Sequence, residues 1–210
     1  TYILKMSIKI RLKNSVNQKS VKNFIFFTNQ DFKIKALNKL PVSQEANLIN
    51  KSILSNKIKD KDFLFFNINA DQKVILIKVE NDVLSLINEK RGAKFYNFIK
   101  SNSFMNLNFF EEKIKELNSK NKHFFDEFIH GLELKSYTFN KYKTKKEKKI
   151  FELDIIIKSK SFEFKKSKRY QSLLEGINYT KDLVSEPGNV LHPDEYSKRL
   201  LQLKKIGLKV

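Results

Sequence analysis

The sequence predicts an α/β protein built around a largely buried mixed sheet. Short apolar runs bounded by polar residues alternate with longer segments whose apolar residues recur every three or four positions, as strands and helices do in such folds. The chain has 210 residues, enough for one domain and the start of another, because domains commonly hold about 100–150 residues. Its 40% hydrophobic content and 19 phenylalanines can furnish a core, and no segment is repeated.

The strands are expected where apolar residues alternate with polar ones or form short continuous runs. Residues 8–12 alternate, which predicts a half-buried strand. Continuous apolar runs predict strands that are buried on both faces. The continuous runs are residues 24–27, 63–66 and 74–79, and further strands are expected at 104–109 and 150–157.

The helices are expected from apolar spacing and from capping residues. Gly131 follows a Phe-rich stripe and would allow a neighbouring helix to pack closely. The expected helices are 46–54 behind Pro41, 83–99 with Asn81 or Asp82 as N-cap, a stretch opened by Glu111 and Glu112, 124–132, 165–185 and 193–206.

The charge balance would ordinarily indicate a polyanionic partner, since the formal net charge is +19. However, only four of the 42 basic residues are arginine, and the chain is rich in Lys, Asn, Ile and Phe, which is typical of a nucleotide-composition bias toward A and T. Arginine is the residue that nucleic-acid sites favour for bidentate contacts. We therefore disfavour nucleic acid as a partner, and the charge run 143–149 predicts a solvated loop.

Composition also bears on the compartment. The chain has no cysteine, which excludes disulfides and thiolate metal sites and fits a reducing compartment. It contains no apolar run near the ~20 residues of a membrane span, and no signal-peptide pattern. The sequence thus predicts a cytoplasmic protein with no membrane partner.

The most informative segment is residues 176–195, which predicts a helix, a stop, a bend and a second helix. Tyr170, Leu173, Leu174, Ile177 and Val184 would form one buried stripe of the first helix.

Proline and glycine residues mark the boundary between the two helices. Pro187 should end the first helix at Glu186, with Gly188 free to take a positive φ in the bend. Pro193 is preset for a first helical turn, and Asp194 and Glu195 would complement the positive end of the helix dipole.

No constellation of residues with readable chemistry is present. His123, His130 and His192 are too scattered for a zinc site, and we expect the first two to be partly exposed beside the Phe stripe, without a carboxylate partner. Asp182 and Glu186 are four residues apart and could pair, although Asp182 is expected to accept backbone N–H bonds at the turn. Ser185 has no nucleophile motif, and no glycine-rich phosphate loop exists.

The order of the segment carries a family resemblance. The run Asp182-Leu183-Val184, Glu186-Pro187, Asn189-Val190-Leu191 and Pro193 resembles a segment of the leucyl (cytosol) aminopeptidase family of metallopeptidases, where it joins the N-terminal domain to the catalytic domain. A weaker echo, Gly131 to Lys143, contains Ser136-Tyr137, Phe139 and Tyr142-Lys143, and it precedes the first in the family's order. His192 departs from the family's usual Thr and is a poorer N-cap.

The resemblance implies a domain plan. Residues 1–5 would be extra residues before a native start at Met6, and 6–160 a three-layer, macro-domain-like α/β domain. Residues 161–186 would be a linking helix, and 187–210 the truncated start of the catalytic peptidase domain.

It also implies an activity for the full-length protein. That protein would release N-terminal amino acids, often leucine, from peptide substrates with two divalent metal ions, manganese or zinc, in a homo-hexamer. The family's metal-binding and catalytic residues would follow Val210, so no catalytic or metal residue is assigned here, the substrate-binding residues are unknown, and the 210-residue chain alone is expected to be inactive.

Two other classes of function stay open on the sequence. A stand-alone basic α/β module could bind nucleic acid through its lysines, with a strong salt dependence. A structural protein could use an exposed apolar face at Leu200, Leu201, Leu203 and Ile206 to bind a partner.

Overall fold

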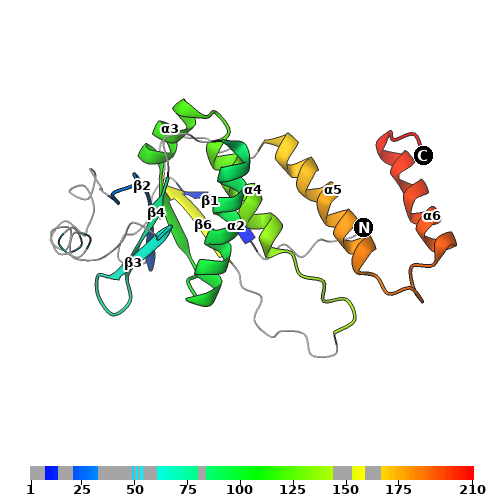
Figure 1. Ribbon diagram of the computed structural model, residues 1–210, viewed down its shortest axis with the longest axis horizontal. Coiled ribbons are helices and arrows are strands. Elements are labelled where there is room, and N and C mark those ends of the chain that lie inside the picture. The colour runs from blue at the N-terminus through cyan, green and yellow to red at the C-terminus, as the bar shows by residue number, and fades with distance from the viewer. Residues whose placement is uncertain are drawn as a thin grey trace.

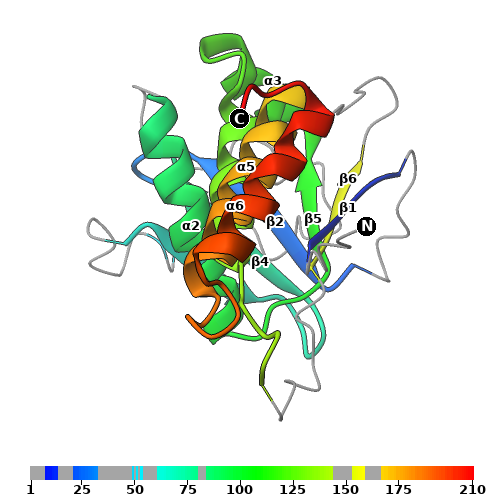
Figure 2. The same cartoon turned by 90° about the vertical axis from the view of Figure 1, so that its right-hand side faces the viewer.

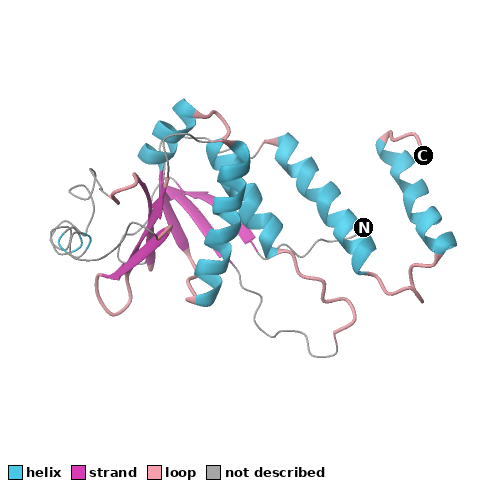
Figure 3. Cartoon of the chain, in the orientation of Figure 1, coloured by secondary structure: helices cyan, strands magenta, loops and turns pink. Residues whose placement is uncertain are grey.

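The structure is a computed structural model that describes residues 8–13, 21–32, 61–79, 84–143, 153–158 and 167–210, together with positions 49, 51 and 53. It is an α/β arrangement in which helices lie beside one sheet, and two further helices extend away from it (Figures 1 and 3). The α/β class predicted from the sequence is confirmed. None of the described helices is long and apolar enough to cross a bilayer.

The described strands form one mixed sheet of six strands in the order β1-β6-β5-β2-β4-β3. Neighbouring strands are parallel except for the antiparallel pair β3 and β4. The strands are β1 (Ile8–Lys13), β2 (Asn23–Thr28), β3 (Phe63–Asn67), β4 (Lys73–Lys78), β5 (Leu107–Phe110) and β6 (Leu153–Lys158).

The two interior strands β2 and β4 are buried on both faces, as their continuous apolar runs predict. Ile25 and Ile75 contribute to one hydrophobic cluster, whereas Phe24 and Val74 contribute to the cluster on the opposite face. This division follows from the period of two in a strand, which turns successive side chains to opposite faces. The sheet is therefore sandwiched between two apolar clusters.

Three helices cover the first face of the sheet (Figure 1). They are α2 (Ser85–Ser101), α3 (Glu111–Lys120) and α4 (Phe124–Ser136). A Cβ built on Gly92 of α2 would lie 1.9 Å from the carbonyl oxygen of Phe128, and one on Gly131 of α4 would lie 1.9 Å from that of Glu89. The close packing predicted at Gly131 is confirmed, and Gly92 meets it from the other helix.

The remaining helices lead away from the sheet. Helix α5 (Lys168–Ser185) lies beside α4, and α6 (Pro193–Leu201) lies beyond α5, so that α5 separates α6 from the sheet (Figures 1 and 2). A 3-10 turn at Gln202–Ile206 follows α6 and ends at Gly207, where φ is 89°. The predicted continuous helix over 193–206 is thus α-helical only to Leu201.

The helix boundaries on either side of the bend between α5 and α6 lie where they were predicted, but the conformation of Gly188 differs. Helix α5 ends at Ser185 with Glu186 as C-cap, and α6 begins at Pro193 with His192 as an N-cap that makes no side-chain capping bond. Gly188, however, does not adopt a positive φ. The bend therefore turns at Pro187 without needing the left-handed conformation that glycine permits.

Three other predictions need correction. Strand β3 is an edge strand and not a fully buried one, because β4 is its only neighbour among the strands that the structure describes and Phe65 is 41% exposed. Strand β5 begins at Leu107, after Phe104. Helix α2 begins at Ser85 with Leu84 as its N-cap, and Leu86 points to solvent instead of the core.

The buried stripe of helix α5 agrees only in part with the predicted one. Tyr170, Leu174 and Asn178 are buried, whereas Leu173 and Val184 are exposed. Leu183 is buried as well, so the buried stripe follows a spacing of four, four and five residues. It includes a polar residue, which the apolar spacing did not reveal.

Several predictions lie outside the described residues. These are the extra residues before Met6, the helix behind Pro41 apart from positions 49, 51 and 53, the caps Asn81 and Asp82, the charge run beyond Lys143, and the boundary at 160/161.

Candidate functional site

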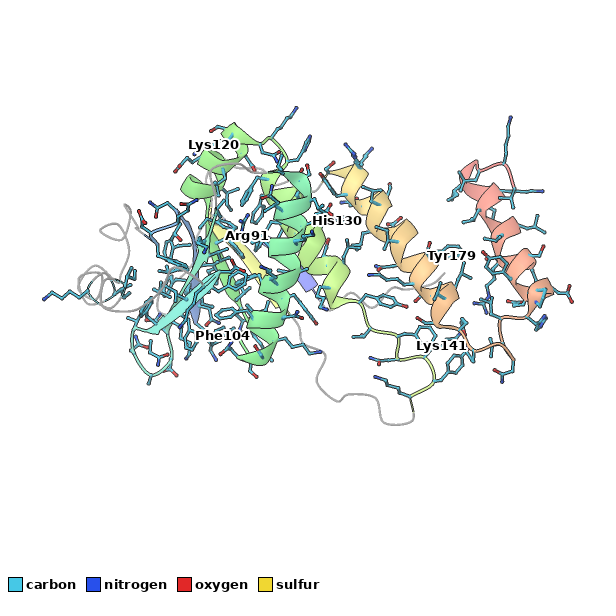
Figure 4. The ribbon with its side chains drawn as sticks, in the orientation of Figure 1. Arg91, Phe104, Lys120, His130, Lys141 and Tyr179 are labelled. Atoms are coloured by element: carbon cyan, nitrogen blue, oxygen red, sulfur yellow. The ribbon has the colours of Figure 1, made fainter. Side chains whose placement is uncertain are left out.

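The most extensive polar cluster of the described residues lies where α4, α5 and α6 approach one another. The loop that leaves α4 runs along the C-terminal end of α5 (Figure 4). The Tyr137 hydroxyl donates to the carboxylate of Asp182 at 2.7 Å, and Lys181 Nζ donates to the carbonyl oxygen of Leu134 at 2.8 Å. Lys181 Nζ also lies 5.1 Å from the centroid of the Tyr137 ring. These contacts join the end of α4 to the last turn of α5.

Glu186 stands at the centre of the cluster. Its carboxylate accepts hydrogen bonds from Lys141 Nζ at 2.6 Å, from the Tyr142 hydroxyl, and from Arg199 Nη1 at 3.2 Å. The Glu186 side chain is only 3% exposed. A carboxylate so covered by donors is well satisfied, since charge-assisted hydrogen bonds are stronger than neutral ones.

The titration of Glu186 reflects these donors. Burial alone would raise the pKa of the carboxyl, but the hydrogen bonds from Lys141, Tyr142 and Arg199 outweigh burial and lower the pKa from 4.5 to about 2. The same bond to Glu186 raises the pKa of Lys141. The pair is thus fully ionised across the neutral range, which favours a structural role over proton transfer.

Arg199 extends the cluster to α6. Its Nε donates to Glu195 at 2.9 Å, one helical turn earlier, and its backbone carbonyl accepts the Tyr179 hydroxyl of α5 at 3.0 Å. Figure 4 shows Lys141 near the lower end of α5 and Tyr179 on the side of α5 that faces α6. We call Lys141, Tyr142, Glu186, Glu195 and Arg199 the junction cluster.

A second polar cluster is buried between α2, α4 and α5. Glu127 is 2% exposed, and its carboxylate accepts four hydrogen bonds. The donors are Ser85 Oγ at 2.5 Å, Asn88 Nδ2 at 2.8 Å, Asn121 Nδ2 at 3.0 Å and the Tyr170 hydroxyl at 3.2 Å. The buried charge is therefore compensated from three elements, and the cluster fixes α5 against the first two helices.

His130 adjoins this second cluster, between α4 and α5 (Figure 4). Its Nδ1 lies 3.1 Å from Glu89 Oε1, and its ring centroid lies 5.2 Å from that of Tyr170. The residue is 2% exposed, so the expectation of a partly exposed histidine without a carboxylate partner is wrong. The Nε2 atom has no hydrogen-bond partner among the described residues.

The structure does not bring the predicted histidines together. His123 precedes α4 as its N-cap, His130 lies within α4, and His192 precedes α6. No three His, Asp or Glu side chains of the described residues group closely enough to hold a metal ion. The donor set of this part of the chain therefore does not fit a metal centre.

The expected roles of the two carboxylates on α5 are also corrected. Asp182 binds the Tyr137 hydroxyl with its side chain, and only its backbone carbonyl accepts the N–H of Glu186. Glu186 binds the junction cluster instead of pairing with Asp182.

Sequence reasoning missed the partners of these carboxylates, because they lie some 45 positions earlier in the chain. A usable signal was present nonetheless. The two segments with a family resemblance, 131–143 and 182–193, are the segments that the junction cluster and the Tyr137–Asp182 bond join.

These polar contacts hold helices together, and no reacting group is evident among the described residues that form them. The carboxylates at positions 127, 182 and 186 are all engaged by donors of the chain itself. The site is thus a structural junction between the sheet-bearing part of the chain and helices α5 and α6.

Comparison with curated proteins gives partial matches to peptidases, while no protein-family profile matches the chain. The chain is 39% identical over 89 residues to a probable cytosol aminopeptidase of Phytoplasma mali, and 34% identical over 89 residues to one of Methylobacterium radiotolerans. Each match covers 40% of this chain and 18% of the relative. The matched region thus spans less than a fifth of the length of either relative.

The fold extends the similarity along nearly the whole chain. A mutant of tomato leucine aminopeptidase superposes with a TM-score of 0.64 at 14% identity, covering 95% of this chain and 42% of that one. The chain is thus similar in sequence to cytosol aminopeptidases over 40% of its length and shares the fold of leucine aminopeptidase over 95% of it. The bottromycin maturation enzyme BotP shows the same fold with a TM-score of 0.56 at 11% identity, covering 90% of this chain and 38% of its own.

The comparisons also bear on the alternative readings of the sequence. Aminopeptidases provide the relatives in sequence and a neighbour in structure, and nothing in them supports a module that binds nucleic acid. The resemblance to leucyl aminopeptidases that the two short segments predicted is confirmed by these relatives and by the shared fold.

Proposed function

We propose that the full-length protein is a metalloaminopeptidase of the leucyl aminopeptidase family, and that the 210 residues form its non-catalytic N-terminal part and the beginning of its catalytic domain. The observation that carries the proposal is the homology to cytosol aminopeptidases over 40% of the chain, supported by a shared fold over 95% of it. Because the match spans only 18% of such a relative, most of the enzyme would lie outside this segment.

The proposed domain plan keeps residues 6–160 as a three-layer domain similar to macro domains, 161–186 as the linking helix and 187–210 as the start of the peptidase domain. The first face of the sheet is covered by α2, α3 and α4, and apolar residues also cover the second face. Helix α5 is joined to the earlier elements by polar side chains beside its buried Leu174. Such a polar contact is typical of an interface between domains.

The proposed reaction is the release of N-terminal amino acids, often leucine, from peptides in the cytoplasm. Two divalent metal ions, manganese or zinc, would activate the attacking water and polarise the scissile carbonyl. The described residues offer no metal centre, so we place both ions in the part of the enzyme that follows. The N-terminal domain would contribute to a homo-hexamer and to substrate access.

The test is made on the polypeptide from its native source. We expect an intact mass about twice the 24.9 kDa of this chain, as a second domain of comparable size requires. The purified native protein should release leucine from leucine amide, lose that activity to a chelator and regain it with Mn²⁺ or Zn²⁺.

The 210-residue chain serves as the comparison under the same conditions, and we expect no turnover from it. Chelator-sensitive turnover by this chain would show that it contains the catalytic residues and would contradict the domain plan. A native protein near 25 kDa without peptidase activity would contradict the proposed function itself.

A further inference from the structure

A single carboxylate holds three segments of the chain at the junction. Glu186, the C-cap of α5, binds Lys141 and Tyr142 of the loop after α4 and Arg199 of α6. The loop and α6 are separated from Glu186 by 44 or 45 and by 13 residues, respectively. The contacts are therefore tertiary and do not follow from the local course of the backbone.

Helix α6 has little else to fix its direction. None of its residues is buried, so it lacks the apolar anchoring that normally orients a short helix. Its described hydrogen bonds to preceding elements come from one residue, Arg199, through the guanidinium to Glu186 and through the carbonyl to Tyr179. Arg199 and Glu186 together thus form the main link across the bend.

The charges of the junction cluster balance only while Glu186 is ionised. Lys141 and Arg199 supply two positive charges, and Glu186 and Glu195 supply two negative ones. Glu195 pairs with Arg199 within α6 and does not reach the loop. A neutral residue at position 186 would remove the one carboxylate that both Lys141 and Arg199 bind, and Glu195 would offset only the charge of Arg199.

We propose that Glu186 is a conformational lock that fixes α6, and the chain that follows it, relative to α5 and the loop 137–143. With the carboxylate in place, α6 has one orientation. Without it, the bend at 187–192 becomes a hinge, because the Tyr179 bond alone is a single neutral hydrogen bond worth about 1 kcal/mol. For the enzyme, and here the inference rests on the proposed function, the lock would set the angle at which the peptidase domain leaves the N-terminal domain.

The lock can be tested on the 210-residue chain itself by measuring the distance between two helices. The chain has no cysteine, so two spin labels can be attached to one molecule through one introduced cysteine on each helix. The substitutions are Ser172→Cys on α5 and Ser197→Cys on α6, both at exposed positions. Double electron–electron resonance should give one narrow distance distribution for the otherwise unchanged chain. In Glu186→Gln we expect that distribution to widen about twofold or more, as a two-state hinge requires.

The matched control is Glu195→Gln, which removes a carboxylate bound to the same arginine but leaves the Glu186 contacts intact. We expect this variant to keep the narrow distribution. A narrow distribution in Glu186→Gln, or equal widening in both variants, would overturn the lock.

A second variant keeps the test decisive if Glu186→Gln fails to fold. Arg199→Met leaves Glu186 bound to Lys141 and Tyr142 while it removes the link to α6. Widening in folded Arg199→Met supports the lock, and an unchanged narrow distribution overturns it. Because no activity is measured, the outcome is independent of whether the full-length protein proves to be a peptidase.

Discussion

Glu186 shows how one residue at a bend of the chain can stabilise tertiary contacts. Its side chain is 3% exposed and is bound by three donors from two other segments. We expect Glu186→Gln to lower the free energy of unfolding by about 2–3 kcal/mol, because the amide replaces charge-assisted bonds with weaker ones and places its own donors against Lys141 and Arg199. Urea denaturation at pH 7 measures the change, with Glu195→Gln as a control that should cost no more than about 1 kcal/mol. Equal losses in the two variants would contradict the central position of Glu186.

The same residue gives a pH dependence with a defined sign. The folded pKa of Glu186 is lowered to about 2 from an ordinary 4.5, so its contribution to stability is complete above pH 4.5 and is lost as the pH falls toward 2. The groups facing it are Lys141, Tyr142 and Arg199, and none of them changes its charge in that window. The difference in stability between the wild type and Glu186→Gln should therefore shrink between pH 4.5 and 2. A difference that stays constant over this range would contradict the assignment.

Tyr137 supplies a second test at the scale of the residue. Burial, and then the hydrogen bond to Asp182, raise the pKa of Tyr137 from 10.0 to about 12. Its contribution is therefore complete below pH 10 and is lost as the pH rises toward 12. We expect Tyr137→Phe to cost about 1 kcal/mol at pH 7, and to cost less above pH 10, as measured by denaturation at each pH. Tyr196→Phe, at a 44% exposed position of α6, is the control and should change little.

The partners of Tyr137 and Asp182 could not be assigned from the sequence, and the reason is physical. Hydrogen-bond partners within a helix recur at three or four residues, and sequence spacing reveals those. Asp182 and Tyr137 are 45 residues apart, so only the packing of α5 against α4 brings them together. His130 was misjudged for the same reason, since Glu89 approaches it from α2.

At the scale of elements, the contact between α2 and α4 depends on two glycines. An added Cβ at Gly92 or Gly131 would lie 1.9 Å from a backbone oxygen of the facing helix, and backbone cannot move aside as a side-chain end can. We expect Gly92→Ala or Gly131→Ala to destabilise the fold by about 3 kcal/mol or more.

Gly176 of α5 provides the matched control for these substitutions. It is an exposed helical glycine with no atom within 4 Å of its added Cβ, so Gly176→Ala should raise stability by about 0.5–1 kcal/mol through helix propensity alone. Thermal or urea unfolding of the three variants measures both signs. A loss at Gly176, or a gain at Gly92, would contradict the close approach of the helices.

The elements themselves were largely predictable, because strands and helices follow local periodicity. The runs 24–27 and 74–79 were expected to be buried strands and are. The error at α5 has a specific cause. Its apolar residues Leu173 and Val184 face solvent, while Asn178 lies inside. The facing surface of α4 is polar where Glu127 and His130 meet Tyr170. Apolar spacing predicts which face is buried only where the facing surface is apolar.

At the scale of the whole molecule, two parts of the chain are held together by different kinds of interaction. The sheet and helices α2 to α4 share a core rich in phenylalanine, in which Phe27 contacts the rings of Phe109, Phe124, Phe125 and Phe128. Helix α5 adds polar contacts to its few buried apolar residues, and α6 buries no residue. The sequence predicted the bend at Pro187, but not the carboxylate that bridges it. The apolar residues predicted to be exposed near the C-terminus include Leu201 at the end of α6 and Ile206 after it, at 46% and 74% exposure.

The net charge of +19 leads to a final prediction for the whole molecule. Lysines supply most of it, and the cations of the junction cluster are already paired with carboxylates. We therefore expect only non-specific binding to duplex DNA at low salt, which should vanish near 0.15 M ionic strength, since each neutralised phosphate contributes about 0.9 to the log–log salt slope. Fluorescence anisotropy with a labelled duplex at several salt concentrations measures this. Retained submicromolar binding at 0.15 M would revive a nucleic-acid function, whereas loss of binding would leave the lysine excess without a dedicated polyanion site and favour the peptidase assignment.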